Sequence, residues 1–160
     1  MASRSSVWSA LREPARRDAL LLDTHVWVWA LEDARGRMSA AAFGLVSAAA
    51  ADRRLYVSDI SFWEVSLKAA KGGLQLSVDP LLWLERAARA PGIQALALTR
   101  DVLIQSTRLP GEMHGDPADR MLVAQAQMAG LTLMTCDAQL VKYARAGGGV
   151  AVCDARGRGA

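Results

Sequence analysis

Residues 19–23 read Ala-Leu-Leu-Leu-Asp, a short apolar run that ends at a carboxylate. Residues 131–137, Leu-Thr-Leu-Met-Thr-Cys-Asp, repeat this form near the other end of the chain. Mostly apolar runs of this kind are typical of parallel strands that helices cover on both faces. In open parallel sheets, ligands bind beyond the carboxyl ends of the strands. The two runs therefore predict an α/β fold with Asp23 and Asp137 at the edge of the sheet where a ligand would bind.

Between these two runs, short β-like segments alternate with longer helical ones, which is the pattern of a parallel sheet flanked by helices. The expected strands are residues 19–22, 55–57, 93–98, 131–135 and 150–153. We expect helices in the gaps. Residues 25–31 are predicted as one of them, although their Val-Trp-Val-Trp run has strand propensity, because a strand has just ended at Asp23.

Two further helices are defined by the residues at their ends. Residues 117–129 begin with a proline after Asp116, a good N-cap, and are followed by Gly130, which favours a helix stop. Residues 80–90 follow Asp79 as N-cap and precede a Pro-Gly pair. Both segments are therefore predicted to be helical.

Size and composition limit the class of protein. The chain has 160 residues, an ordinary length for one domain that buries its own core. Hydrophobic residues make up 52% and charged residues 22%, and no apolar run approaches the roughly 18 residues of a membrane span, so we expect no membrane partner. The net charge of +3 and the pI near 9.2 permit attraction to a polyanion without indicating one. Cys136 and Cys153 lack metal-ligand spacing, so we expect reduced thiols in a cytoplasmic protein.

The two ends of the chain differ from the middle. Residues 1–18 are rich in Ser, Arg and Ala, and residues 154–160 are Gly-rich and basic. We expect both to be flexible, as chain ends commonly are. Glu13 and Pro14 do not suit an organelle transit sequence, so the first segment is interpreted as an appended start. The folded domain is then predicted to span residues 19–153.

Two further acids, Glu64 and Asp119, are placed to join Asp23 and Asp137 at the sheet edge. Each lies in the first turns of a predicted helix. Taken alone, every one of these acids is also explained by helix capping, since carboxylates near a helix N-terminus are favoured. Capping does not require that all of them meet at one edge, so the arrangement indicates a site.

Four segments carry a resemblance to a known family. They are residues 20–25 (LLLDTH), 58–65 (SDISFWEV), 114–122 (HGDPADRML) and 133–137 (LMTCD). In this order and at this rough spacing they resemble the successive motifs of PIN domains, particularly those of VapC-like toxins. The resemblance covers residues 19–153, and the third segment with the downstream Thr-x-Asp is its most specific part.

This resemblance implies a three-layer α/β/α sandwich with a central, mainly parallel sheet. It implies a Mg²⁺- or Mn²⁺-dependent endoribonuclease that acts as the toxin of a toxin–antitoxin pair, has a cognate antitoxin as partner and forms a homodimer. The acids that would bind metal and act in catalysis are Asp23, Glu64, Asp119 and Asp137. The side chains that would orient them are Thr24, Asp116, Arg120 and Thr135. Those that would bind RNA are Lys68, Lys71 and Arg120.

The expected chemistry follows from the residue types. Hard carboxylate oxygens suit Mg²⁺ or Mn²⁺, and such ions promote hydrolysis of a phosphodiester by water, which leaves a 5′-phosphate and a 3′-hydroxyl. No histidine is needed for this reaction, so His25 and His114 are interpreted as structural or substrate-contacting residues. Arg120 is expected to pair with a neighbouring carboxylate and set its position. Asp116 is explained equally well as a helix N-cap.

Other functions stay open at this point. A DNA nuclease of related fold would use similar acids, and a non-catalytic PIN-type scaffold would keep the fold after losing them. A response-regulator receiver would need adjacent acids after its first strand, and residues 19–22 are followed by a single one. The tryptophans on expected helices are interpreted mainly as core residues, some of which would line a groove for the antitoxin: Trp27, Trp29, Trp63 and Trp83.

Overall fold

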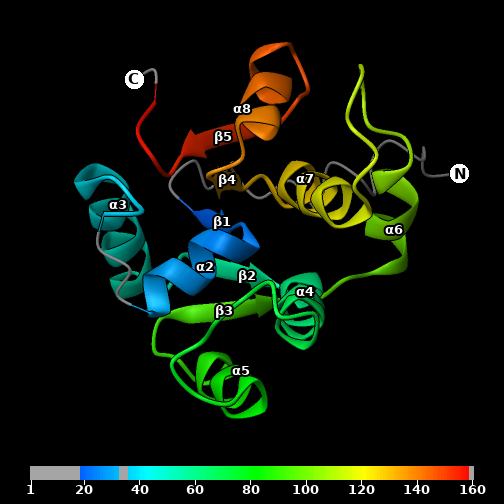
Figure 1. The fold of residues 1–160 in the computed structure, drawn as a ribbon. Coiled ribbons are helices and arrows are strands. Elements are labelled where there is room, and N and C mark those ends of the chain that lie inside the picture. The colour runs from blue at the N-terminus through cyan, green and yellow to red at the C-terminus, as the bar shows by residue number, and fades with distance from the viewer. Residues whose placement is uncertain (1–18, 33–35, 159–160) are drawn as a thin grey trace, which may run out of the picture.

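The computed structural model describes residues 19–32 and 36–158. Its centre is a five-stranded sheet in the order β3-β2-β1-β4-β5, in which every neighbouring pair is parallel. The strands are β1 (Leu20–Leu22), β2 (Leu55–Ser58), β3 (Ile93–Leu96), β4 (Thr132–Thr135) and β5 (Ala151–Asp154). The predicted parallel sheet is therefore confirmed, and its strands end at one edge (Figure 1). The extension predicted at residues 1–18 lies outside the described residues.

Seven helices in the described part of the chain cover the two faces of the sheet (Figure 1). They are α2 (Thr24–Leu31), α3 (Ala40–Ala51), α4 (Asp59–Ala70), α5 (Pro80–Ala88), α6 (Arg100–Ser106), α7 (Pro117–Ala129) and α8 (Ala138–Arg145). Residues 25–31 are helical as predicted, and α2 begins one residue earlier because Asp23 caps it. The strand predicted over residues 93–98 ends at Leu96, since Thr99 is already the N-cap of α6.

The ends of α7 and α5 follow from local capping. The Asp116 carboxylate accepts the N–H of Asp119 at 3.0 Å, and Gly130 closes α7 with a φ of 65°, so the predicted bounds of this helix are confirmed. The Asp79 side chain caps α5, which begins where the sequence predicts. This helix ends slightly earlier than predicted, at Ala88.

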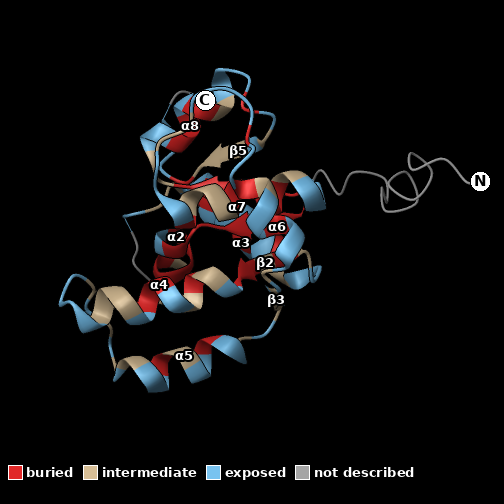
Figure 2. Ribbon diagram, turned by 90° about the vertical axis from the view of Figure 1, so that its right-hand side faces the viewer, coloured by how far each residue is buried: buried red, intermediate tan, exposed pale blue. Residues whose placement is uncertain are grey.

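The sheet separates two hydrophobic layers because successive side chains of a strand point to opposite faces. On one face, Leu20 and Leu22 belong to a buried cluster with Trp27 of α2 and with residues of α3, α4 and α5. On the other face, Leu21 belongs to a cluster with Leu122 of α7 and with residues of α6 and α8. The predicted three-layer sandwich is thus confirmed, and Figure 2 shows the buried residues gathered around the sheet.

The last strand extends the domain beyond its predicted end at residue 153. Asp154 is the final residue of β5, and Ala155 is fully buried with its N–H donated to the Thr135 carbonyl at 2.8 Å. The guanidinium of Arg158 donates to the Asp154 carboxylate at 3.0 Å. The flexible tail predicted from residue 154 is therefore wrong at its beginning, because Asp154 pairs in the sheet and anchors the arginine that follows.

The structure also places the tryptophans and cysteines. Trp27, Trp29 and Trp83 are buried as predicted, whereas Trp63 is 56% exposed on α4 and does not belong to the core. Cys136 and Cys153 are free thiols, as expected, although Cys136 directly follows β4 and Cys153 lies in the neighbouring strand β5. Within residues 19–32 and 36–158, no helix has the length and apolar character needed to cross a membrane.

Candidate active site

The carboxyl edge of the sheet places two of the four predicted acids directly. Asp23 follows β1 and Asp137 follows β4, its neighbour in the sheet, and each is the N-cap of the next helix. Glu64 comes from α4, and Asp119 from the first turn of α7. Side chains that cap the helices also belong to the site. The Asp137 carboxylate, for example, accepts the N–H of Gln139 at 2.7 Å and is still partly exposed, so a ligand can reach it.

Thr24 connects two of these acids. Its backbone N–H donates to Asp23 Oδ1 at 2.6 Å, and its hydroxyl donates to Glu64 Oε1 at 2.7 Å. Ser61 Oγ lies 2.9 Å from the same hydroxyl, and all of these residues are buried. Thr24 therefore fixes the two carboxylates relative to each other. Ser61, which the sequence did not single out, belongs to this network, and its place one helical turn before Glu64 is the signal that would have found it.

Thr135, at the end of β4, connects Asp23 with Asp137 in the same way. Its hydroxyl donates to Asp23 Oδ2 at 2.6 Å and accepts the N–H of Asp137 at 3.0 Å. Both oxygens of Asp23 are therefore held by hydrogen bonds from inside the protein. Asp116, by contrast, contacts only the backbone of Asp119 among the predicted acids, so its place in the structure is that of an N-cap.

Burial and neighbouring acids raise the pKa of Asp23 and of Asp119. Burial raises the pKa of Asp23, the hydrogen bond from Thr135 lowers it, and the negative charge of Glu64 raises it. Burial, and then the charges of Asp23 and three other acids, raise the pKa of Asp119 to about 8. Carboxylates from separate segments of the chain therefore share one electrostatic environment. Asp119 is mostly protonated at neutral pH unless a cation compensates its charge.

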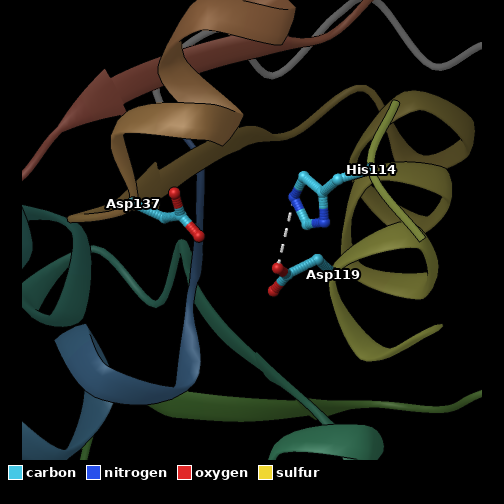
Figure 3. Close-up of side chains that lie close together, drawn as sticks. All are labelled: His114, Asp119 and Asp137. Carbon is cyan, nitrogen blue, oxygen red and sulfur yellow. Dashed lines mark ion pairs between the residues drawn. The ribbon is translucent and has the colours of Figure 1, made fainter. Parts of the chain in front are cut away.

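His114 adds an imidazole to this edge. Its Nε2 lies 3.5 Å from Asp119 Oδ2. Figure 3 shows the ring and the carboxylates of Asp119 and Asp137 directed into one space. Each of the three offers one ligand atom, and these atoms lie within 4.8 Å of one another, the only such group of histidine, cysteine or acidic side chains in the described residues. Asp23 and Glu64 stand beside this group without belonging to it.

The lysines predicted to bind RNA occupy different positions. Lys68 Nζ lies 3.1 Å from Glu64 Oε2, so this lysine reaches the acids. Lys71 is the exposed C-cap of α4, farther along the same helix. His25 lies near Lys68 and near Asp23. Burial and the charge of Lys68 lower the pKa of His25, while the charge of Asp23 raises it. Positive charge is thus present beside the acids on the side of α2 and α4.

Among the residues that the structure describes, Arg120 does not pair with a carboxylate, and that prediction is wrong. Its Nε donates to the carbonyl of Ser106 at 2.9 Å, and one Nη donates to the carbonyls of Met113 and His114 at 3.1 and 3.4 Å. The reason is its position in the first turn of α7, from which the guanidinium turns to the connection from α6. Arg120 therefore holds the backbone that carries His114.

The donors present fit a divalent cation. Carboxylate oxygens are the ligands that Mg²⁺ and Mn²⁺ prefer, and imidazole nitrogen suits several transition metals. Two observations in the structure support the binding of such a cation. His114 Nε2 is buried and makes no hydrogen bond to any described residue despite its contact with Asp119, and the pKa of Asp119 is raised to about 8. A cation between these groups would satisfy both.

Solved structures with a similar fold come from toxin–antitoxin complexes. The complex VapBC2 from Rickettsia felis, bound to a promoter DNA fragment, matches with a TM-score of 0.62 and 14% identity over 85% of this chain and 98% of that one. DNA-bound VapBC from Salmonella typhimurium matches with a TM-score of 0.62 and 18% identity over 85% and 97% of the two chains. VapBC-5 from Mycobacterium tuberculosis matches with a TM-score of 0.53 and 19% identity over 89% and 99%. At these identities the likeness concerns the fold.

Sequence comparison gives the family. Residues 20–146 match the model of the PIN domain. The chain is also 33% identical over 121 residues to Ribonuclease VapC22 of Mycobacterium tuberculosis, an alignment that covers 76% of this chain and 88% of that protein. Residues 20–146, which match the family model, contain every acid of the site described above. On this evidence the chain belongs to the PIN domain family.

Proposed function

We propose that this protein is a metal-dependent endoribonuclease that acts as the toxin of a toxin–antitoxin pair. The observation that carries the proposal is the meeting of Asp23, Glu64, Asp119 and Asp137 at the carboxyl edge of the sheet: Thr24 and Thr135 link Glu64, Asp23 and Asp137 by hydrogen bonds, and the neighbouring acids help to raise the pKa of Asp119. Similarity to a protein named Ribonuclease VapC22 supports RNA as the substrate. The proposed reaction is hydrolysis of a phosphodiester bond.

The metal ion, Mg²⁺ or Mn²⁺, would be held by Asp119 and Asp137 with Asp23 and Glu64 beside them. When bound, such an ion supplies an activated water and neutralises the charge that develops on the phosphate. The acids alone would repel RNA, because they put negative charge where a phosphate has to lie. The raised pKa of Asp119 favours its protonated form, which relieves part of that repulsion in the metal-free protein, and a bound metal would take over this role.

Thr24 and Thr135 set the geometry of the acids before any ligand arrives. The hydroxyl of Thr135 and the backbone N–H of Thr24 occupy the two oxygens of Asp23, each at 2.6 Å, and the Thr24 hydroxyl holds Glu64 at 2.7 Å. Such supporting hydrogen bonds fix the direction of a ligand oxygen and strengthen metal binding. The two threonines are therefore assigned as positioning residues.

RNA would approach over α2, where positive charge lies close to the acids. The guanidinium groups of Arg156 and Arg37 lie 5.5 and 5.9 Å from the centre of the Trp29 ring, and the ring of His25 lies 6.3 Å from it. His25 in turn is coupled to the charge of Asp23. Arg37 and Arg156 supply the positive charge of this approach, which suits contacts with the phosphate backbone, whereas His25, whose pKa is lowered, offers hydrogen-bonding groups. The predicted contact by Arg120 is withdrawn, because its guanidinium is occupied by backbone carbonyls.

A cognate antitoxin is the proposed protein partner, in the cytoplasm, and the toxin itself is proposed to form a homodimer. Support comes from the similar solved structures, which are VapBC pairs, and from apolar side chains left on the surface of α4 and α5. Trp63, Leu81 and Leu82 are 56%, 68% and 39% exposed. Large apolar side chains at a surface are common at protein interfaces, so we assign the antitoxin to this side of the molecule.

Substrate class and product ends test the proposed reaction. Purified protein is incubated with Mn²⁺ and either an RNA pool or single-stranded DNA of the same sequences, and the termini of the products are labelled. We expect cleavage of RNA that leaves a 5′-phosphate and a 3′-hydroxyl, because water is the attacking group. A 2′,3′-cyclic phosphate would reject attack by water, and equal cleavage of DNA would favour a DNA nuclease.

A further inference from the structure

His114 is the residue at this site for which the proposed reaction provides no role. Four acids are enough to bind a metal that hydrolyses RNA, yet the imidazole is directed into the same space as Asp119 and Asp137 (Figure 3). Its Nε2 atom is buried and makes no hydrogen bond within the described residues. A buried nitrogen without a partner is unfavourable in the absence of a ligand, so this atom needs one.

The geometry of the three side chains suits a shared ion. Their ligand atoms lie within 4.8 Å of one another. Bonds from a divalent metal to nitrogen or oxygen are about 2.0–2.2 Å long, so three ligands of one ion lie about 3–4 Å from one another. The side chains therefore need to move by less than about 1 Å to bind the same ion, which is within the range of small side-chain adjustments.

A purely structural role for His114 explains the geometry less well. In that role Nε2 would donate to Asp119, but the two atoms are 3.5 Å apart and do not form a hydrogen bond. On the other side of the ring, Nδ1 accepts the N–H of Asp116 at 3.4 Å, a long contact. Metal binding at Nε2 would place the proton on Nδ1 and end only this weak bond.

The backbone around His114 is held firmly enough to present a ligand. Arg120 donates to the His114 carbonyl at 3.4 Å and to the Met113 carbonyl at 3.1 Å, so a residue of α7 fixes the connection that carries the imidazole. The side chain of His114 is only 25% exposed. The ring is thus positioned by the fold before a ligand binds.

We propose that His114 is a nitrogen ligand of the metal at this site and that the site therefore binds Mn²⁺ in preference to Mg²⁺. The inference rests on the proposed metal-dependent function and adds a ligand to it. Mg²⁺ binds oxygen and keeps much of its water, whereas imidazole nitrogen is a good ligand for first-row transition metals. A mixed set of His114, Asp119 and Asp137 selects the second class of ion.

Electron spin echo spectroscopy of bound Mn²⁺ tests this assignment, because it detects a nitrogen bonded to the ion. The chain contains two histidines, His25 and His114, so a tag-free protein gives a simple assignment. We expect a ¹⁴N modulation in the wild-type protein, its loss in His114→Gln and its persistence in His25→Gln, the matched control. Calorimetric titrations should show that His114→Gln weakens Mn²⁺ binding by about tenfold or more and Mg²⁺ binding much less.

The possible results separate the two levels of the proposal. Mn²⁺ binding and RNA cleavage without a ¹⁴N modulation in the wild-type protein would overturn the role of His114 and leave the nuclease in place. Failure of the wild-type protein to bind Mn²⁺ at all would overturn both. If His114→Gln does not fold, the spectra of the wild-type protein and of His25→Gln still decide, because a signal that persists without His25 belongs to His114.

Discussion

Asp119 is the residue whose protonation a bound cation would change most clearly. Its pKa is raised from the usual 3.8 to about 8, first by burial and then by neighbouring acids. Between these two values the folded protein holds a proton that the unfolded chain has lost. The free energy of unfolding of the metal-free protein therefore falls as pH rises through this window, and the loss is complete above it.

Replacing the Asp119 carboxyl with an amide should remove this loss of stability at high pH. In EDTA, we expect Asp119→Asn to raise the midpoint of thermal unfolding at about pH 8.5 by a few degrees and to change it little at about pH 5. Thermal melts at both pH values measure this. Asp52→Asn is the control, since Asp52 is exposed, pairs with Arg54 and precedes β2 at the opposite edge of the sheet. An equal change for Asp119→Asn at both pH values would contradict the raised pKa.

Thr24 should matter for metal binding more than for folding. Thr24→Val keeps the shape of the side chain but removes the hydroxyl that donates to Glu64 Oε1. Loss of a supporting hydrogen bond typically weakens metal affinity or activity by about 10–100-fold, which calorimetry with Mn²⁺ and an RNA cleavage assay would measure. Thr107→Val, which removes an exposed hydroxyl at the end of α6, should change neither. Wild-type affinity in Thr24→Val would mean that Glu64 needs no such support.

The sequence predicted the positions of the acids better than the directions of the longer side chains. Asp23 and Asp137 could be placed because the first follows β1 directly and the second follows β4 after one residue, and parallel strands end at one edge. The partners of Arg120 and the orientation of His114 depend on how the connection between α6 and α7 folds. No local rule fixes that path, so their contacts could not be derived from spacing.

At the scale of elements, the side chain of Arg120 ties the connection from α6 to α7 to the helix that carries Asp119. Arg120, in the first turn of α7, bonds to carbonyls at the end of α6 and just before α7. His114 lies in this connection, which has no regular secondary structure, and stands beside Asp119. The hydrogen bonds of Arg120 should therefore contribute to the order of the connection.

Arg120→Ala should loosen this connection. Hydrogen bonds from a charged group contribute about 1.5–3 kcal/mol each at most, so we expect the free energy of unfolding to fall by about 1–3 kcal/mol. Hydrogen exchange should become faster in residues 107–116, and Mn²⁺ should bind more weakly because His114 is displaced. Arg108→Ala, an exposed arginine of the same connection, is the control. Exchange at the wild-type rate in Arg120→Ala would contradict the anchoring role.

Elements with local end signals were predicted well, and those that depend on a neighbour were not. The bounds of α7 follow from Asp116 and Gly130, which act on their own helix. The last strand is half exposed and pairs only with β4, so its bounds are set by that partner. Its register, with Thr135 opposite Asp154, carries the strand past the predicted end.

At the scale of the whole molecule, the order of the strands explains how distant motifs form one site. β1 lies between β2 and β4, so the end of the first strand meets the end of the fourth. The hydrogen bond from Thr135 to Asp23 joins residues 112 positions apart in the chain. The acids collect at this edge although the net charge of the protein is +3, so basic residues elsewhere in the sequence outnumber the acidic ones.

Metal-dependent cleavage of an RNA pool is the measurement that bears on the whole proposal. The wild-type protein, Asp119→Asn and the control Asp52→Asn are each assayed in Mn²⁺, in Mg²⁺ and in EDTA, after a check that all three are folded. We expect cleavage by the wild-type protein and by Asp52→Asn only when metal is present, and no cleavage by Asp119→Asn. Cleavage in EDTA, or cleavage by Asp119→Asn at the wild-type rate, would contradict a metal-dependent nuclease built on these acids.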